Sequence, residues 1–149
     1  MTINIHKLIK IQCLIFLFLI CGNATAGEIA IIINEKNPAV DLSDLEIKQL
    51  YLKNNTHWKH GKKIRPAAYS YEADIAIEFY SKVLFMTETE VERHWIEVQY
   101  GKALKPPVQL DDSSAMLKFI GKFKGSIGFV ELNEVANNSK VKVLKVIDY

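Results

Sequence analysis

The chain has 149 residues, a formal net charge of +2 and 24% charged residues, which fits one globular domain rather than a disordered chain. Both cysteines, Cys13 and Cys21, lie in the N-terminal apolar segment. Disulfides, thiol chemistry and cysteine–metal sites are therefore excluded for the rest of the chain. Residues 1–26 also contain Lys7 and Lys10 and no acid, which leaves 17 basic residues (19 less two) against 17 acidic ones. A neutral domain gives no reason to expect a nucleic-acid partner.

Residues 1–26 have the pattern of a secretory signal peptide. A basic start precedes an apolar run from Ile11 to Cys21, and Ala24-Thr25-Ala26 forms a small-residue cleavage site. The run is shorter than the roughly 20 residues that a membrane-spanning helix needs. We therefore expect cleavage, a mature domain of residues 27–149 and no transmembrane span after cleavage.

Cys21 offers a second interpretation of the same segment, a lipoprotein signal. The residue before it, Ile20, is branched and bulky where such a signal needs a small side chain. The cleaved signal is favoured over a retained anchor or a lipid anchor, and we expect a periplasmic protein.

The first elements of the mature domain are a strand and a helix. The segment EIAIIIN, residues 28–34, is continuously apolar and predicts a strand buried on both faces. Ser43 and Glu46 have the spacing of a capping box, with Leu42 and Ile47 placed as a hydrophobic staple. A helix is therefore predicted to begin at Ser43.

The middle of the chain predicts one strand and two helices. IRPAAYS is a strand in spite of Pro66, and helical spacing begins at Glu72. Two apolar stripes follow on that helix: Ile75, Phe79 and Val83, beside Ala76, Tyr80 and Leu84. A further helix is predicted from Glu88 to Tyr100, because Gly101 and the Pro106-Pro107 pair stop it.

The last third predicts strands around one helix. PVQL is a short strand. Asp111, Asp112 and Ser113 are alternative N-caps for a helix in which Met116, Ile120 and Phe123 share one face. SIGFVEL and VKVLKVI are the closing strands. Strands that alternate with helices predict a single α/β domain.

Several of these segments also occur in a familiar order. They are LSDLEIKQLYLKNNTHWKHGKKIRP, the strand GSIGFVEL and, between them, Trp95, Tyr100, Gly101 and Pro106-Pro107. Together they resemble the phosphate-specific periplasmic binding proteins of ABC transporters, and in particular their short, single-lobe members. The resemblance covers Ile29 to Asp148. It implies one lobe of a type 2 periplasmic binding protein, with a mixed central sheet flanked by helices.

The resemblance also implies where an anion would bind. Full-length relatives hold phosphate between two lobes, and we expect the other lobe to be missing from this chain. In this lobe they use an arginine and a glycine-serine-glycine-threonine turn that opens a helix. Aligned on Phe79, those positions fall on different residues here: Tyr69, Glu72, Ala73, Asp74 and Ile75.

The substituted turn predicts a degenerate anion site. We expect Glu72 and Asp74 to satisfy the free N–H groups of the helix start and to repel phosphate. Ligands of such sheets sit at the carboxyl ends of strands, here the Ser70–Asp74 and Asp111–Ser114 turns. The remaining candidate ligand-binding residues are Arg65, Tyr69, Ser70, Tyr71, Ser113 and Ser114.

Other clusters favour structural interpretations. The loop HWKHGKKIR gathers basic residues around Trp58 as a possible patch for an anionic partner, but a solvated turn with Trp58 on the core is favoured. His57 and His60 lack a third metal ligand nearby. His94 is expected on the surface of its helix, and the serines and aspartates near Asp111 have no histidine to form a nucleophile pair.

The leading prediction is therefore a periplasmic solute-binding-protein-like module, not an enzyme, with phosphate or another oxyanion as its ligand and no cofactor or metal. The alternative is an envelope protein-interaction or sensory accessory module that binds no small ligand. A single lobe cannot close over a ligand, so a homodimer or an envelope protein partner would complete the cleft.

Overall fold

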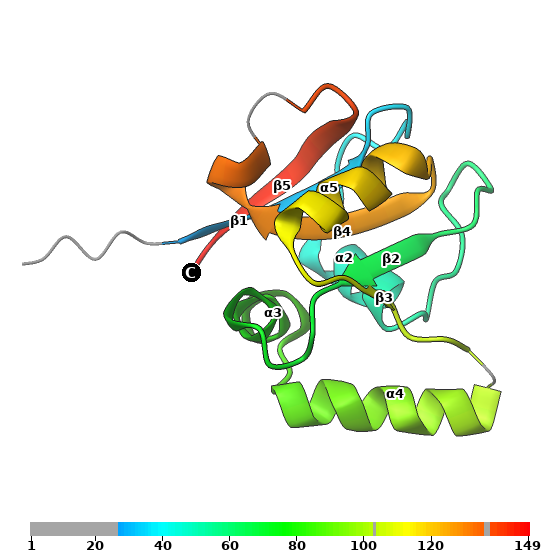
Figure 1. Cartoon of the computed structure of the whole chain (residues 1–149). Helices are drawn as coiled ribbons and strands as arrows, with labels where there is room; N and C mark the ends of the chain where they lie inside the picture. The colour runs from blue at the N-terminus through cyan, green and yellow to red at the C-terminus, as the bar shows by residue number, and fades with distance from the viewer. Residues whose placement is uncertain (1–26, 103, 136–137) are drawn as a thin grey trace, which may run out of the picture.

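The computed structural model describes residues 27–102, 104–135 and 138–149; the predicted signal peptide lies outside them. Five strands form one sheet, in the order β3-β2-β4-β1-β5 (Figure 1). Their bounds are β1 Glu28–Asn34, β2 Arg65–Ala68, β3 Val108–Gln109, β4 Ser126–Glu131 and β5 Val141–Asp148. The helices are α2 Asp44–Tyr51, α3 Asp74–Phe79, α4 Glu88–Lys102 and α5 Ser113–Lys122. A π-helical turn, η1 (Tyr80–Leu84), continues α3, and a 3₁₀ turn, η2 (Leu132–Val135), follows β4.

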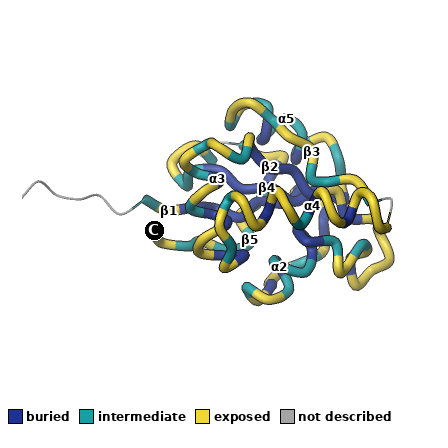
Figure 2. The backbone as a smooth tube through the Cα atoms, turned by 90° about the horizontal axis from the view of Figure 1, so that it is seen from below, coloured by how far each residue is buried: buried dark blue, intermediate teal, exposed yellow. Residues whose placement is uncertain are grey.

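The sheet is mixed, as the sequence predicts. Strand β2 runs parallel to both β3 and β4, whereas β1 is antiparallel to its two neighbours, β4 and β5. The carboxyl ends of β2, β3 and β4 therefore meet at one edge, which we call the carboxyl edge. Helices α2 and α5 lie on opposite faces of the sheet in both views (Figures 1 and 2), and α4 lies below α3 in Figure 1.

Local sequence rules account for the main elements. Strand β1 is buried from Ile29 to Asn34 and lies inside the sheet, as its continuous apolar run predicts. The capping box at the start of α2 is present, because the Ser43 hydroxyl accepts from the Glu46 N–H while the Glu46 carboxylate accepts from the Ser43 N–H. Strand β2 forms in spite of Pro66, which pairs with Ile127.

An aromatic stack joins the helices to the sheet. Phe79 of α3 lies parallel to Phe129 of β4 with ring centroids 4.0 Å apart, and Tyr51 of α2 tilts against Phe79 at 4.7 Å. All three side chains are buried, and the buried residues follow the strands in Figure 2. Burial of each large aromatic side chain contributes a few kcal/mol to stability, about 2 to 3.

The basic loop before β2 has the favoured, structural arrangement. Trp58 is 5% exposed, and its indole N–H donates to the carbonyl of Gly125 at 3.0 Å. Lys59, Lys62 and Lys63 remain exposed. His94 is different from expectation, since it is only partly exposed and its Nε2 lies 3.3 Å from the Leu52 carbonyl oxygen.

Candidate functional site

Two strand ends meet at the carboxyl edge and bring most of the predicted ligand residues together. Tyr69, Ser70 and Tyr71 follow β2, and Leu110 follows β3. The two ends are tied by a hydrogen bond from the Leu110 N–H to the Ala68 carbonyl, at 2.9 Å. This edge is where open α/β sheets bind their ligands.

Arg65 is not among these residues. It opens β2, so it lies at the opposite end of the strand from Tyr69. Its guanidinium lies over the ring of Phe123, 4.7 Å from the centroid, and its backbone N–H donates to Gly125. The candidate set therefore lacks its arginine at the carboxyl edge.

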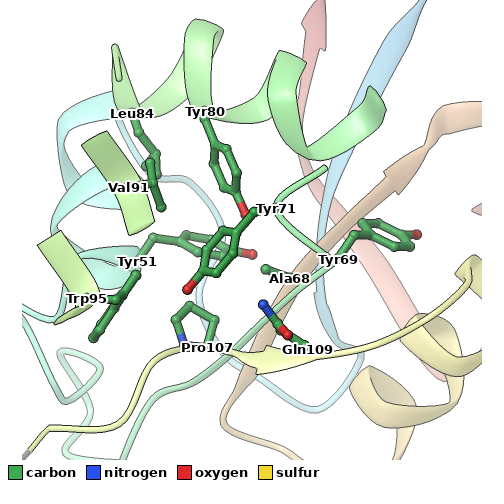
Figure 3. A pocket seen from close by; sticks show the side chains of 10 residues that line it. All are labelled: Tyr51, Ala68, Tyr69, Tyr71, Tyr80, Leu84, Val91, Trp95, Pro107 and Gln109. Atoms are coloured by element: carbon green, nitrogen blue, oxygen red, sulfur yellow. The ribbon is translucent and has the colours of Figure 1, made fainter. Parts of the chain in front are cut away.

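A tyrosine-lined pocket opens beside the two strand ends (Figure 3). Tyr71 and Tyr80 project into it, with Trp95 of α4 and Gln109 of β3 around them. It encloses about 10 Å³, room for a single water molecule. In the same view the ring of Tyr69 points away, toward β4, where it meets the edge of Phe129.

The pocket contains residues that the sequence analysis did not select. The sequence places Tyr80 on an apolar stripe of its helix and Gln109 in a short strand, and neither position suggests a site. Tyr51 is fully packed, and its hydroxyl donates to the Ala67 carbonyl at 3.1 Å. The only available signal was the density of tyrosines around a strand end.

Negative charge surrounds the carboxyl edge. Burial raises the pKa of Tyr69, and the carboxylates of Glu134, Asp112 and Glu131 raise it further. The Tyr149 hydroxyl donates to Glu131, and this bond raises the pKa of Tyr149 to about 12, with smaller effects from burial and nearby carboxylates. These tyrosines remain neutral hydrogen-bond donors at physiological pH.

The helix starts at this edge differ. Asp112 caps α5, because its Oδ1 accepts from the Ala115 N–H at 2.7 Å, and the Ser113 hydroxyl donates to Glu134 at 2.7 Å. Helix α3 begins at Asp74, two residues later than predicted, and no side chain caps it. The expectation that Glu72 and Asp74 satisfy its free N–H groups is therefore wrong. Both carboxylates are exposed, and they still place negative charge at this helix start.

The chemistry available at the carboxyl edge is hydrogen bonding. Serine and tyrosine hydroxyls donate and accept, whereas the carboxylates only accept at neutral pH. Among the residues that the structure describes, no group of three histidine, cysteine or acidic side chains is placed to hold a metal ion. No helix in the same residues has the length and apolar character needed to cross a bilayer.

No protein-family model matches this chain, and no curated protein matches it. Solved structures do. An ABC-type phosphate transport receptor from Vibrio cholerae has a TM-score of 0.65 and 19% identity, over 80% of this chain and 46% of that one. A protein from Clostridium perfringens with bound phosphate is described as a phosphate ABC transporter substrate-binding protein. It has a TM-score of 0.64 and 19% identity, over 80% of this chain and 45% of that one. PstS from Borrelia burgdorferi has a TM-score of 0.64 and 11% identity, over 80% of this chain and 47% of that one.

These likenesses concern the fold. The chain spans less than half the length of each solved neighbour, which corresponds to about one of the two lobes. The mixed five-stranded sheet and its flanking helices agree with that assignment. The chain therefore has the fold of one lobe of a phosphate-type periplasmic binding protein.

Proposed function

We propose that the protein is a non-enzymatic, periplasmic solute-binding module that holds phosphate or another oxyanion weakly at the carboxyl edge. The observation that carries the proposal is the meeting of the β2 and β3 ends, which brings Tyr69, Ser70 and Tyr71 to the edge where such folds bind ligands. Ser113 and Ser114 begin α5 at the same edge. The solved neighbours named for phosphate transport support an oxyanion as the ligand class.

Weak binding follows from the charges at the edge. Glu72 and Asp74 stand at the start of α3, and each close like-charge contact costs about 1 kcal/mol even in water. Arg65, the candidate cation, lies at the far end of β2. Neutral hydroxyl donors alone hold an oxyanion less tightly than an arginine does.

A second lobe would strengthen the site. One lobe offers an open edge, so we propose that a second copy of the chain or another envelope protein covers it. Light scattering of the purified protein with and without phosphate tests the first option. A phosphate-dependent dimer is expected, and a monomer under both conditions would leave a different protein as the covering partner.

Titration calorimetry with phosphate and sulfate tests the ligand. The protein expressed from its full sequence should bind phosphate with a dissociation constant of about 1 mM. The double variant Ser70→Ala with Tyr71→Phe should weaken binding further. The matched control, Ser81→Ala with Tyr100→Phe, makes the same chemical changes at exposed positions elsewhere and should bind like the wild type. An absence of saturable heat at millimolar phosphate would contradict the proposal.

The periplasmic location has its own test. Cell fractionation should recover the protein in the periplasmic fraction, and N-terminal sequencing should begin at Gly27. A first residue of Met1, or recovery with the cytoplasm, would contradict the signal-peptide prediction.

A further inference from the structure

A groove lined by lysines runs along α5, from Ser113 and Ser114 at the carboxyl edge to Lys122 at the other end of the helix. Two adjoining hollows of about 730 and 280 Å³ form it, and they share Gly121, Lys122, Ser139 and Lys140. The lysines come from three separate parts of the chain. Together, the lysine groove contains Lys36, Lys118, Lys122, Lys124 and Lys140.

The charges in this groove are available to a ligand. All five lysines are exposed, and within the described residues the ion pairs lie elsewhere, at Lys59–Glu46 and Lys145–Asp44. Glu35 is the one carboxylate that lines either hollow. Five lysines less Glu35 give a local net charge of +4 in a mature chain whose overall charge is zero.

A buried hydrogen-bond network fixes the floor of the groove. Asn34 is 4% exposed, and its side-chain N–H₂ donates to the carbonyls of Ile120 and Gly121 at 2.8 and 3.0 Å. At Gly121 a Cβ atom would stand 3.0 Å from the Cβ of Lys140, so the glycine lets the 138–140 turn approach α5 closely. The end of β1, the end of α5 and this turn therefore form one packed unit.

Helix stability explains only part of this charge. Lys122 and Lys124 lie at the carboxyl end of α5, where cations suit the helix dipole. Lys36 and Lys140 come from other segments, so the sequence of α5 does not account for them. Serine and asparagine donors from Ser114, Asn138 and Ser139 line the same hollows.

We propose that the lysine groove binds a short chain of linked phosphates, such as tripolyphosphate. A single phosphate brings about two negative charges, half of the net positive charge that the groove offers. The groove is longer than one phosphate, because its two hollows share only part of their lining. Lysine suits this ligand, since it is a point-charge phosphate binder that needs no fixed bidentate geometry.

The lining also favours a free phosphate chain over larger anions. None of the residues that line the two hollows is aromatic, so a nucleic-acid base would find no stacking partner there. Leu117 is the one large apolar lining residue, and the surface is hollowed, whereas a membrane surface favours exposed apolar and basic side chains together. Ser113 and Ser114 border both this groove and the carboxyl edge, but none of the five lysines is a candidate residue of the oxyanion site.

Calorimetry with tripolyphosphate in metal-free buffer, at low and moderate salt, tests the proposal on the protein expressed from its full sequence. Wild type should bind tripolyphosphate more tightly than orthophosphate, with affinity that falls as salt rises. Combining Lys118→Ala, Lys122→Ala and Lys140→Ala should weaken it about tenfold. The control Lys82→Ala, Lys102→Ala and Lys105→Ala removes the same charge elsewhere and should keep wild-type affinity. Circular dichroism should show both triple variants folded.

Several results would overturn the proposal. Equal loss in the control variant would assign binding to overall charge rather than to the groove. No saturable tripolyphosphate binding, or tighter binding of ATP than of tripolyphosphate, would remove the free phosphate chain as the ligand. Binding to phosphatidylglycerol vesicles without binding to tripolyphosphate would make the groove a lipid-binding surface.

Discussion

The carboxyl edge and the lysine groove border the same helix yet carry opposite charge. Asp112 caps the start of α5 beside Glu131 and Glu134, whereas Lys118 and Lys122 line its later turns. The edge is where open α/β sheets bind their ligands, but five exposed lysines gather at the groove. The balance of 17 basic and 17 acidic residues in 27–149 therefore hides a separation of charge within one small domain. A fold indicates where ligands bind, and side chains decide which ligands those are.

The largest expected effect comes from Asn34→Ala, which changes the groove and leaves the carboxyl edge unaltered. The change removes three side-chain hydrogen bonds: two donated to the carbonyls of Ile120 and Gly121, and one accepted from the Lys36 N–H. It leaves the carbonyl of Gly121 without that donor and should cost about 2 to 3 kcal/mol of unfolding free energy. Urea denaturation measures the loss. Asn133→Ala, at an exposed asparagine, is the control and should leave stability unchanged. Equal stability of the two variants would show that the floor of the groove is not anchored in this way.

Removing charge at the carboxyl edge should make the two regions more alike. Glu72→Gln with Asp74→Asn removes two carboxylates next to the proposed oxyanion site. Loss of two repulsive contacts of about 1 kcal/mol each should raise phosphate affinity at least about tenfold. Calorimetry measures the change. Glu97→Gln with Asp41→Asn makes the same charge change at exposed sites and should have little effect. A similar gain in the control would reveal a general charge effect.

The tyrosine pocket contains both a structural and a free hydroxyl. Tyr51→Phe should cost about 1 kcal/mol, because it leaves the Ala67 carbonyl without its bond from the buried hydroxyl. Tyr80→Phe should cost less, since the Tyr80 hydroxyl faces the pocket. Thermal unfolding of both variants and the wild type measures the two losses of stability. A larger loss for Tyr80→Phe than for Tyr51→Phe would contradict this assignment.

The smallest effect concerns the capping box, remote from both regions. Bonds to Lys59 and Ser43 lower the pKa of Glu46 from its usual 4.5 to about 2. A lowered carboxyl pKa stabilises the fold above pH 4.5, and that contribution is lost as the pH falls toward 2. Thermal unfolding of Glu46→Gln should therefore differ from wild type at pH 6 and converge with it at pH 2. Glu97→Gln, at an exposed position outside any capping box, should show no such convergence.

Local chemistry made much of the fold predictable. The run EIAIIIN, the Ser43 capping box and the Asp112 cap each act over a few residues, and each is present. A second capping box, in which the Glu90 carboxylate accepts from the Thr87 N–H and hydroxyl, obeys the same spacing but was not predicted. The signal was available in the sequence TETE.

Long-range geometry limited the prediction of sites. Arg65 and Tyr69 are close in sequence, but an extended strand carries them to opposite ends of β2. The lysine groove joins the end of β1, the length of α5 and the 138–140 turn, and no periodicity relates those segments. Charge counts along the chain could not reveal it, because its lysines are interleaved with residues that face elsewhere.

Strand β1 has a consequence for the order in which the chain can fold. Its only sheet partners within the described residues are β4 and β5, so Ile29 pairs with Glu131 and Ile147. The first strand of the sheet, apolar from Ile29 to Ile33, must wait for the last two before its pairing is complete. Such distant pairings fold slowly, and completion of the sheet requires the finished chain. A sheet that is still incomplete during synthesis suits the export that we propose.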